Sequence, residues 1–434
     1  MGVLRVDPVD GLSGELRVPS DKSLTHRAIL LAGVSDRAVR VGATLDSADT
    51  AATLGAIEAC GVVIEGDLGD ELVISGAGLR GLRPAPAIDC ANAGTLMRLL
   101  PGLLVGQQAD RIVLDGDDSL RGRPMGRIAT PLRAMGASIW TAPGGTPPLA
   151  VSGGAPLQAV EHDLPVASAQ VKSCLLLAGL FAEGRTVVRE PAPSRDHTER
   201  MLRAAGVPLE EVERGVAITG PVEGIALPDL DVPGDPSSAA PLAAAAVLRA
   251  DPEVRLRGVN LNPLRTGLFR VLERMGAPVR IEPAQEVAGE PAGDVVVGRA
   301  DPLHATEVAP EEVPSLIDEL PLVGLLGALA AGTTRVHGAA ELRVKESDRI
   351  AAVVGALRAL GVKAEEHEDG FSVTGAPRLL GGEVASGGDH RMAMLGAVAG
   401  LASLVGVRVS GFEAVDVSYP GFARDLARLA AVGA

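Results

Sequence analysis

The sequence predicts a mixed α/β (α+β) fold of two similar globular domains, each built from three βαβαββ units. Two repeated patterns support this prediction: a helix that ends at a glycine before a strand, and an almost wholly apolar helix followed by another strand. The chain has 434 residues, a length that suits two domains. Hydrophobic residues make up 47% of it and aromatic residues only 2%, so we expect a core of Ala, Val, Leu and Ile.

The first pattern is an amphipathic helix that ends in Gly, followed by a small or β-branched residue that opens a strand. A glycine at this place suits the positive φ of a helix C-terminus. The longest interval between copies contains residues 283–293, which are rich in Pro, Gly and Glu, and we expect a loop insertion there. The glycines, about one sixth of the chain apart and degenerate in the last copy, are Gly61, Gly136, Gly206, Gly276, Gly361 and Gly433.

The second pattern is a helix that is apolar on all sides, which must be buried. The predicted buried helices are Ala28–Val34, Leu96–Val105, Ser173–Phe181, Ala239–Leu248, Leu320–Ala331 and Met392–Leu404. The strands predicted to follow them are Ala38–Val41, Ile112–Leu114, Thr186–Val188, Val254–Leu256, Thr334–Val336 and Val407–Val409.

Residues 231–235 lie near the middle of the chain and are predicted to cross between the domains. We therefore expect an N-terminal domain over residues 19–232 and a C-terminal domain over residues 1–18 plus 233–434. A six-repeat solenoid scaffold is the alternative, but repeats that alternate buried and exposed helices rarely stack as simple arrays.

The composition also argues against several classes of protein. A net charge of −15 disfavours a nucleic-acid coat protein or a polybasic membrane binder. Cys60, Cys90 and Cys174 are far apart, which fits a reducing cytosol better than a disulfide framework. Residues 1–7 resemble a charged strand rather than a signal peptide, and no apolar run is long enough to span a membrane. We expect a soluble cytoplasmic enzyme.

Polar clusters open the six predicted buried helices, and they differ too much from one another to be mere helix caps. Equivalent repeats would bring these helix N-termini to one region, where their dipoles and added cations attract phosphates and carboxylates. In an acidic chain, such a basic focus indicates small anionic ligands. The clusters are residues 20–27, 92–98, 168–172, 234–238, 318–319 and 389–391.

Three segments carry the strongest cation patterns. Ser23 and Arg27 are four residues apart on one helical face, beside Lys22, and suit a double anion clamp; a solvated first turn is the alternative. Residues 115–125 add two arginines or form a charged turn. Residues 343–349 place Lys345 and Arg349 four apart, with Glu346 three before Arg349, and form either a further cation cluster or a salt-bridged surface helix.

Two apparent motifs carry no function. Residues 76–81 match GxGxxG, but prolines follow where a dinucleotide-binding helix would begin, so a turn is predicted. The seven histidines form no close ligand pair, and we expect neither a metal site nor a cofactor. Ser237 and Ser238 are interpreted as helix-capping residues.

Taken together, the clusters closely resemble the 5-enolpyruvylshikimate-3-phosphate (EPSP) synthase family, from about Val18 to Phe422. The family fold is two globes of three βαβαββ units each, an inside-out α/β barrel with the active site in the cleft between them. The segments that carry the resemblance are Ser20–Arg27, Asn92–Arg98, Gly116–Met125, Ser168–Lys172, Gly234–Ala239, Asp318–Glu319, Arg343–Arg349, Asp389–Met394 and Tyr419–Phe422.

The resemblance implies a reaction between shikimate-3-phosphate and phosphoenolpyruvate that yields EPSP and phosphate. The 5-hydroxyl adds to C2 of phosphoenolpyruvate while C3 is protonated, and the tetrahedral intermediate then expels phosphate. This chemistry needs a base, an acid and cations. By position, Asp318 corresponds to the base and Glu346 to the acid, with Lys22 assisting proton movement.

The resemblance also implies the binding residues. Those for phosphoenolpyruvate are Lys22, Gly94, Arg123, Gln170, Arg349 and Arg391. Those for shikimate-3-phosphate are Lys22, Ser23, Arg27, Ser168, Ala169, Gln170, Ser194, Asp318 and Lys345. The herbicide glyphosate occupies the phosphoenolpyruvate site in this family. No nucleic acid or membrane partner is implied, and a monomer is expected.

Some phrases match the subgroup called class II, among them Arg195 to Glu199, whose His197 stands where other members have a Tyr. Asn262 to Arg265 is an imperfect copy of another class II phrase, and Val417 stands roughly where class I members carry a Lys. Two other enzyme classes remain as alternatives. A UDP-N-acetylglucosamine enolpyruvyl transferase would have a loop Cys near Asp118, and an RNA 3′-phosphate cyclase would need basic tracks and aromatic stacking platforms.

Overall fold

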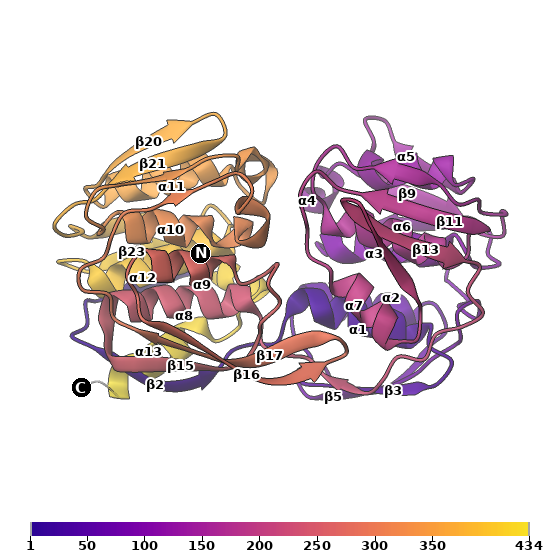
Figure 1. The fold of residues 1–434 in the computed structure, drawn as a ribbon, viewed down its shortest axis with the longest axis horizontal. Coiled ribbons are helices and arrows are strands. Elements are labelled where there is room, and N and C mark those ends of the chain that lie inside the picture. The colour runs from indigo at the N-terminus through magenta and orange to yellow at the C-terminus, as the bar shows by residue number, and fades with distance from the viewer. Residues whose placement is uncertain (1, 433–434) are drawn as a thin grey trace. The chain divides into compact units, whose positions relative to one another are not determined.

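The computed structural model describes residues 2–432, which form six small sheets packed against helices. The chain divides into two compact units. Unit 1 comprises Met1–Pro19, Pro233–Gln285 and Pro291–Ala434, and unit 2 comprises Ser20–Val232 and Glu286–Glu290. In Figure 1 unit 2 carries mainly the indigo to magenta part of the ribbon and unit 1 mainly the orange to yellow part.

Unit 2 contains three four-stranded sheets with strand orders β14-β3-β5-β4, β6-β7-β9-β8 and β10-β11-β13-β12. Its helices are α1 (Lys22–Gly33), α2 (Ala48–Glu58), α3 (Gly94–Leu104), α4 (Asp118–Arg121), α5 (Gly126–Ala134), α6 (Ala169–Gly179) and α7 (His197–Ala204). Its strands are β3 (Ala38–Gly42), β4 (Val63–Gly66), β5 (Glu71–Ser75), β6 (Ala87–Asp89), β7 (Ile112–Asp115), β8 (Ser138–Ala142), β9 (Thr146–Ser152), β10 (Glu161–Asp163), β11 (Gly184–Arg189), β12 (Leu209–Val212), β13 (Gly215–Gly220) and β14 (Leu230–Asp231).

Unit 1 contains two four-stranded sheets, β16-β17-β15-β2 and β18-β19-β21-β20, and the three-stranded sheet β1-β23-β22. Its α-helices are α8 (Pro236–Arg249), α9 (Gly267–Arg274), α10 (Leu320–Gly327), α11 (Arg349–Ala359), α12 (His390–Ala402) and α13 (Phe422–Val432). Its strands are β1 (Val3–Val6), β2 (Leu12–Arg17), β15 (Ala250–Asn260), β16 (Val279–Val287), β17 (Glu290–Gly298), β18 (Glu307–Val308), β19 (Thr333–Val336), β20 (Lys363–His367), β21 (Gly370–Thr374), β22 (Gly382–Ala385) and β23 (Val407–Ser410).

The strand pairing confirms the predicted α/β fold of repeated units. In the second repeat, for example, β6 pairs parallel with β7 across α3, and β9 pairs antiparallel with both β7 and β8. Unit 1 combines both ends of the chain, because β1 pairs with β23 and β2 pairs with β15. The first sheet of unit 2 is completed by β14, which pairs with β3 just before the chain returns to unit 1.

The repeated glycines end their helices as predicted. All five that lie within the described residues have positive φ, between 83° and 95°. In each, the next residue donates its N–H to a carbonyl five positions back, as Ala137 does to Leu132 and Val362 does to Leu357. This is the Schellman helix ending, which favours glycine. The sixth copy, at Gly433, lies outside the described residues.

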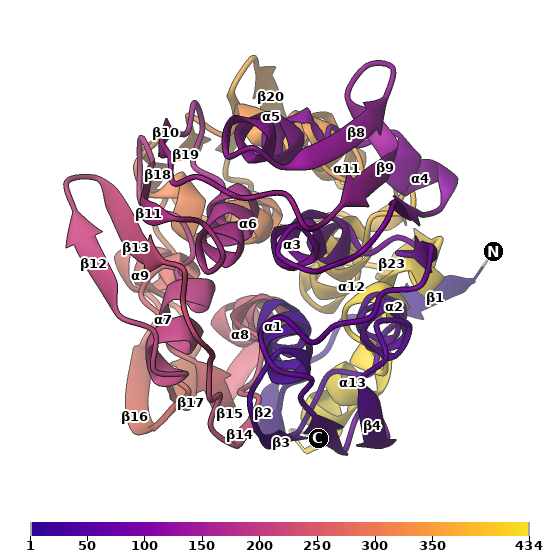
Figure 2. The same ribbon diagram turned by 90° about the vertical axis from the view of Figure 1, so that its right-hand side faces the viewer.

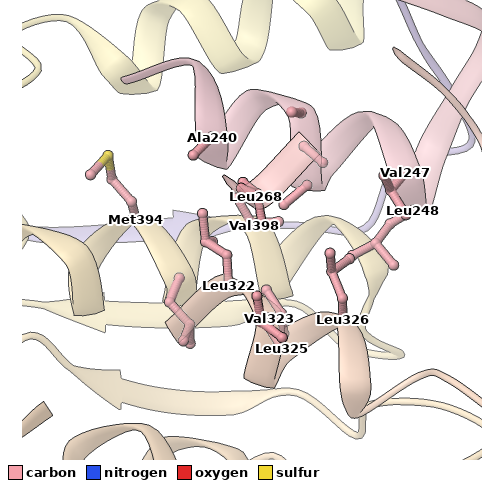
Figure 3. Close-up of a cluster of buried hydrophobic side chains, with 14 of the residues drawn as sticks. Ala240, Val247, Leu248, Leu268, Leu322, Val323, Leu325, Leu326, Met394 and Val398 are labelled. Atoms are coloured by element: carbon pink, nitrogen blue, oxygen red, sulfur yellow. The ribbon is translucent and has the colours of Figure 1, made fainter. Parts of the chain in front are cut away.

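The core of each unit is formed by the helices predicted to be buried. In unit 1, α8, α10 and α12 lie side by side, and Figure 3 shows Ala240, Leu322, Met394 and Val398 meeting between them. In unit 2, α1, α3 and α6 have the same role and are neighbours in Figure 2. No helix within residues 2–432 has the length and apolar character that crossing a membrane requires.

Two predicted elements were wrong. Residues 283–293 are not a loop: they lie in strands β16 and β17, joined by a two-residue turn at Ala288 and Gly289. Both turn residues have positive φ, as a tight hairpin turn requires, and Pro283 is tolerated because β16 is an edge strand. The helix predicted over Leu320–Ala331 ends already at Gly327.

The close packing of α3 on α6 depends on Gly102. A Cβ at this position would overlap the Cys174 carbonyl oxygen and lie 3.1 Å from Leu177 Cβ. We expect Gly102→Ala to lower the free energy of unfolding by about 1–3 kcal/mol, since neither helix can move freely. Gly55→Ala, in α2 with no atom within 4 Å, is the control and should raise that free energy by about 0.5–1 kcal/mol. Denaturant unfolding of both variants measures the difference, and equal effects would contradict it.

His26 of α1 gives the fold a dependence on pH. It is fully buried, with Nδ1 2.6 Å from Thr53 Oγ1, and burial lowers its pKa from 6.5 to about 3. The unfolded chain therefore takes up this proton first, so stability falls as the pH drops below 6.5 and the loss levels off near 3. Between pH 7 and pH 5 this one group should cost about 2 kcal/mol.

His26→Gln keeps a hydrogen-bonding side chain beside Thr53 but does not titrate. We expect its free energy of unfolding to depend less on pH, by about 2 kcal/mol between pH 7 and pH 5. Urea titrations at both pH values measure this. If wild type and variant lose equal stability over that interval, His26 is not the responsible group.

Candidate active site

The predicted site residues of unit 2 lie around the N-termini of its buried helices. Lys22 is the first residue of α1, which Asp21 caps by accepting a hydrogen bond from Leu24 N. Lys22 Nζ lies 2.9 Å from Asp49 Oδ2, at the start of α2. Burial opposes the charged form of Asp49, but Lys22 and its neighbours outweigh this effect and hold its pKa below the ordinary value. Lys22 is thus held at the helix entrance by a carboxylate.

Arg27 is buried among neutral partners, although it lies on the same helical face as Ser23, as predicted. Its Nε donates to Thr198 Oγ1 at 2.8 Å, one terminal nitrogen donates to Ser173 Oγ at 3.0 Å, and the other to Ser23 O at 2.9 Å. Burial lowers its pKa to about 10. This cation is fixed at the junction of α1, α6 and α7.

Arg123 contacts the N-terminus of α3. One terminal nitrogen donates to Asn92 Oδ1 at 2.8 Å, and Asn92 Nδ2 in turn donates to Asp117 at 2.7 Å. The other terminal nitrogen lies 2.9 Å from the place that a Cβ on Gly94 would occupy. The absence of a side chain at Gly94, the first residue of α3, therefore leaves room for this guanidinium.

The N-terminal turn of α6 carries the next predicted residues. Gln170 accepts a hydrogen bond from Arg98 at 2.6 Å and donates to Thr95 Oγ1 at 3.1 Å, so it is linked to the start of α3. Ser168 caps the helix, and Ala169 follows it. A cavity of about 290 Å³ opens beside Ser168 within unit 2.

Ser194 precedes α7 and is turned toward buried charges. Its N–H donates to Glu190 Oε1 at 3.1 Å, its hydroxyl donates to Glu190 Oε2, and its carbonyl accepts from Lys172 Nζ at 3.2 Å. All three polar groups of Ser194 therefore have protein partners, which hold this residue in a defined orientation.

In unit 1 the predicted base and acid meet at one guanidinium. Arg349 donates to Asp318 at 3.1 Å, to Glu346 at 2.6 Å and to Asp389 at 2.7 Å. It is 1% exposed, and although burial opposes its charge, the three carboxylates raise its pKa above the ordinary value. Lys345 Nζ lies 3.5 Å from Asp318, so Asp318 faces two cations.

The backbone around these residues excludes the alternative of a salt-bridged surface helix over 343–349. Residues 340–344 form a 3₁₀ helix, Lys345 is extended, and α11 begins only at Arg349. Lys345 and Arg349 are therefore not on one face of a surface helix. The cause is Asp348, which caps α11 by accepting a hydrogen bond from Ala351 N at 3.1 Å.

Arg391 lies at the entrance of α12. One terminal nitrogen donates to Ser237 O at 2.9 Å, and the Nε is buried with no hydrogen-bond partner among the described residues. The prediction that Ser237 caps α8 was wrong, because the capping residue is Asp235. The Ser237 hydroxyl instead donates a hydrogen bond to Glu319. A buried guanidinium with an unused donor suits an anionic ligand.

Sequence reasoning missed several supporting residues. Asp49, Arg98 and Asp389 each fix a predicted site residue across a long sequence separation, and only Arg98 and Asp389 lay within motifs that had been singled out. These pairs form because helix N-termini from distant parts of the sequence pack together, which the sequence alone does not reveal. Within the described part of the chain, no group of three or more His, Cys, Asp or Glu is placed to hold a metal ion.

Comparison with known proteins identifies the family of this chain. The family model described as "EPSP synthase (3-phosphoshikimate 1-carboxyvinyltransferase)" matches residues 6–426. Proteins named 3-phosphoshikimate 1-carboxyvinyltransferase from Halorhodospira halophila and Thermus thermophilus are each 48% identical, covering 98% and 99% of this chain and 95% and 100% of their own lengths.

Solved structures show the same fold. EPSP synthase from Acinetobacter baumannii superposes with a TM-score of 0.90 at 40% identity, over 99% of this chain and 98% of that one. The enolpyruvyl transferase NikO from Streptomyces tendae is 20% identical with a TM-score of 0.78 and supports the fold alone. Because the family model matches residues 6–426 and a relative that is 48% identical covers 98% of the chain, the chain belongs to the EPSP synthase family.

Proposed function

We propose that the residues around Lys22 in unit 2 and those around Arg349 in unit 1 serve the enolpyruvyl transfer of this family, from phosphoenolpyruvate to the 5-hydroxyl of shikimate-3-phosphate. The observation that carries the proposal is Arg349, whose single buried guanidinium holds Asp318 and Glu346 together. A base and an acid on one cation suit a reaction that removes a proton from a hydroxyl and adds a proton to carbon.

Asp318 takes the proton of the 5-hydroxyl as its oxygen bonds to C2 of phosphoenolpyruvate. Glu346 delivers a proton to C3, which completes a tetrahedral intermediate. Phosphate then leaves from C2 with the proton that Asp318 took up, and C3 returns a proton to Glu346, which restores the double bond. Arg349 and Lys345 lie beside Asp318, and the side chain of Glu346 is 34% exposed.

Phosphoenolpyruvate carries a carboxylate and a phosphate, and its binding is assigned to cations on helix entrances. The unused Nε of buried Arg391 supports this assignment. The proposed set is Lys22, Gly94, Arg123, Gln170, Arg349 and Arg391.

Shikimate-3-phosphate is assigned to the residues around α1 and α6, together with the charged pair of unit 1. Arg27, fixed in the junction of three helices, supports the assignment. The proposed set is Lys22, Ser23, Arg27, Ser168, Ala169, Gln170, Ser194, Asp318 and Lys345. We further propose a monomer in the cytoplasm, where the three buried free thiols stay reduced.

Phosphate release from phosphoenolpyruvate tests the function. We expect release with shikimate-3-phosphate and none with UDP-N-acetylglucosamine or without acceptor. Asp318→Asn keeps the shape of the side chain but removes the base, so kcat should fall by about 10²-fold or more while the affinity for shikimate-3-phosphate changes much less. Release that requires the UDP-sugar, or an unchanged kcat in the variant, would contradict the proposal.

Gly94→Ala tests the phosphoenolpyruvate site. The added Cβ would lie 2.9 Å from Arg123 and 3.2 Å from Arg98, so it would displace their guanidinium ends or intrude on the ligand. Glyphosate is longer than phosphoenolpyruvate, and we expect its inhibition constant to rise by a larger factor than the KM of phosphoenolpyruvate. A steric difference of about 1–3 kcal/mol corresponds to about 10–200-fold discrimination.

The control is Gly126→Ala at the start of α5, where a Cβ meets no atom within 4 Å. Steady-state inhibition at matched saturation with phosphoenolpyruvate compares the three proteins. Equal fold-changes in both constants for Gly94→Ala would mean that this glycine does not line the site.

A further inference from the structure

The turn between β11 and α7, residues 190–196, is tied to a buried pair of charges. Lys172 of α6 and Glu190 at the start of the turn are 3% and 7% exposed, and Lys172 Nζ lies 2.6 Å from Glu190 Oε1. Glu190 then accepts both the N–H and the hydroxyl of Ser194, and Lys172 donates to the Ser194 carbonyl. Two charged side chains thus satisfy every polar group of one turn residue.

Stability alone is a weak reason for such a pair. Removing two charges from water costs about as much as their attraction returns, so buried ion pairs often add little to folding. What the pair supplies is a defined geometry, because each oxygen of Glu190 and the ammonium of Lys172 holds one specific atom of the turn. Arg195, the next residue, lies close enough to Arg27 for its charge to lower the pKa of that guanidinium.

The turn leads directly into α7, whose Thr198 accepts a hydrogen bond from Arg27 Nε at 2.8 Å. Ser194 of the turn and Arg27 are both among the residues proposed to bind shikimate-3-phosphate. The hydrogen bonds at Ser194 hold the turn in one conformation before the ligand arrives. The ligand then meets a site already formed and loses less conformational entropy on binding.

We propose that Lys172 and Glu190 are positioning residues for shikimate-3-phosphate, which hold the 190–196 turn in its binding conformation through Ser194. This inference rests on the proposed function and deepens it. Neither residue is expected to touch the substrate or the reacting atoms, since the side chains of both are almost wholly buried.

The chain offers a matched control. Glu199 of α7 is 4% exposed, and its Oε1 lies 2.8 Å from the same Lys172 ammonium, but among the described residues the carboxylate that Ser194 contacts is that of Glu190. Glu190→Gln and Glu199→Gln each remove one buried carboxylate from Lys172. Only the first removes the acceptor pair of Ser194, because one oxygen of the side chain becomes an amide donor.

Binding of shikimate-3-phosphate to the full-length protein is measured by calorimetry, alongside kcat, the KM of phosphoenolpyruvate and the midpoint of thermal unfolding. We expect Glu190→Gln to raise the Kd of shikimate-3-phosphate about tenfold, the scale of one hydrogen bond to a charged group. The kcat and the KM of phosphoenolpyruvate should stay within about twofold. Glu199→Gln should leave all three within about twofold, with a similar loss of thermal stability.

A further variant removes the buried charges together, so that none is left without a partner. Lys172→Met combined with Glu190→Gln and Glu199→Gln makes all three positions neutral, and we expect a folded protein with the same tenfold loss of affinity. Lys172→Arg keeps the cation and should retain most of the wild-type affinity.

Equal losses of affinity in Glu190→Gln and Glu199→Gln would show a merely structural role and overturn the inference. Wild-type affinity in the folded triple variant, or a fall in kcat with unchanged binding, would also overturn it. Failure of the proposed function is a separate result: the wild type itself would then release no phosphate and bind no shikimate-3-phosphate, and the assigned role of the pair would fall with it.

Discussion

A helix that is apolar on every side has only its ends available for polar chemistry, and this constraint shapes the molecule. The buried helices α1, α3 and α6 pack their sides into the core of unit 2, so their polar residues gather at the first turn. There the free N–H groups and the helix dipole favour anions. Lys22, Gly94 and Gln170 all stand at such places. The same rule puts Arg391 at the entrance of α12.

Charges gathered in this way need partners, because an isolated buried ion is costly. Both units solve the problem with one cation shared among carboxylates. In unit 1, Arg349 is shared by Asp318, Glu346 and Asp389. In unit 2, Lys172 is shared by Glu190 and Glu199. The two groups differ in exposure. The side chains of Asp318 and Glu346 are partly exposed, whereas those of Glu190 and Glu199 are buried, and we assign Glu190 a positioning role.

Local sequence rules predicted what local interactions determine. The helix-ending glycines, exemplified by Gly136, and the shared face of Ser23 and Arg27 follow from backbone conformation and helical spacing. The hairpin over 283–293 was missed because its proline and glycine count outweighed a strand pattern that an edge position tolerates. The pairing of Lys22 with Asp49, or of Ser194 with Glu190 and Lys172, could not be predicted, since it depends on how helix entrances meet in space.

The donors of Arg349 connect substrate binding with the acid and base. A guanidinium has five N–H groups, and four bonds already lead to Asp318, Glu346 and, twice, Asp389. Bidentate binding of the phosphoenolpyruvate carboxylate, as proposed, needs two donors. It must therefore displace Asp318 or Glu346 from the guanidinium, while Asp389, fully buried, keeps its hold. In the proposed mechanism, the carboxylate released in this way is the one that exchanges a proton with the substrates, so the proposed binding of phosphoenolpyruvate and the proposed proton transfer meet at Arg349.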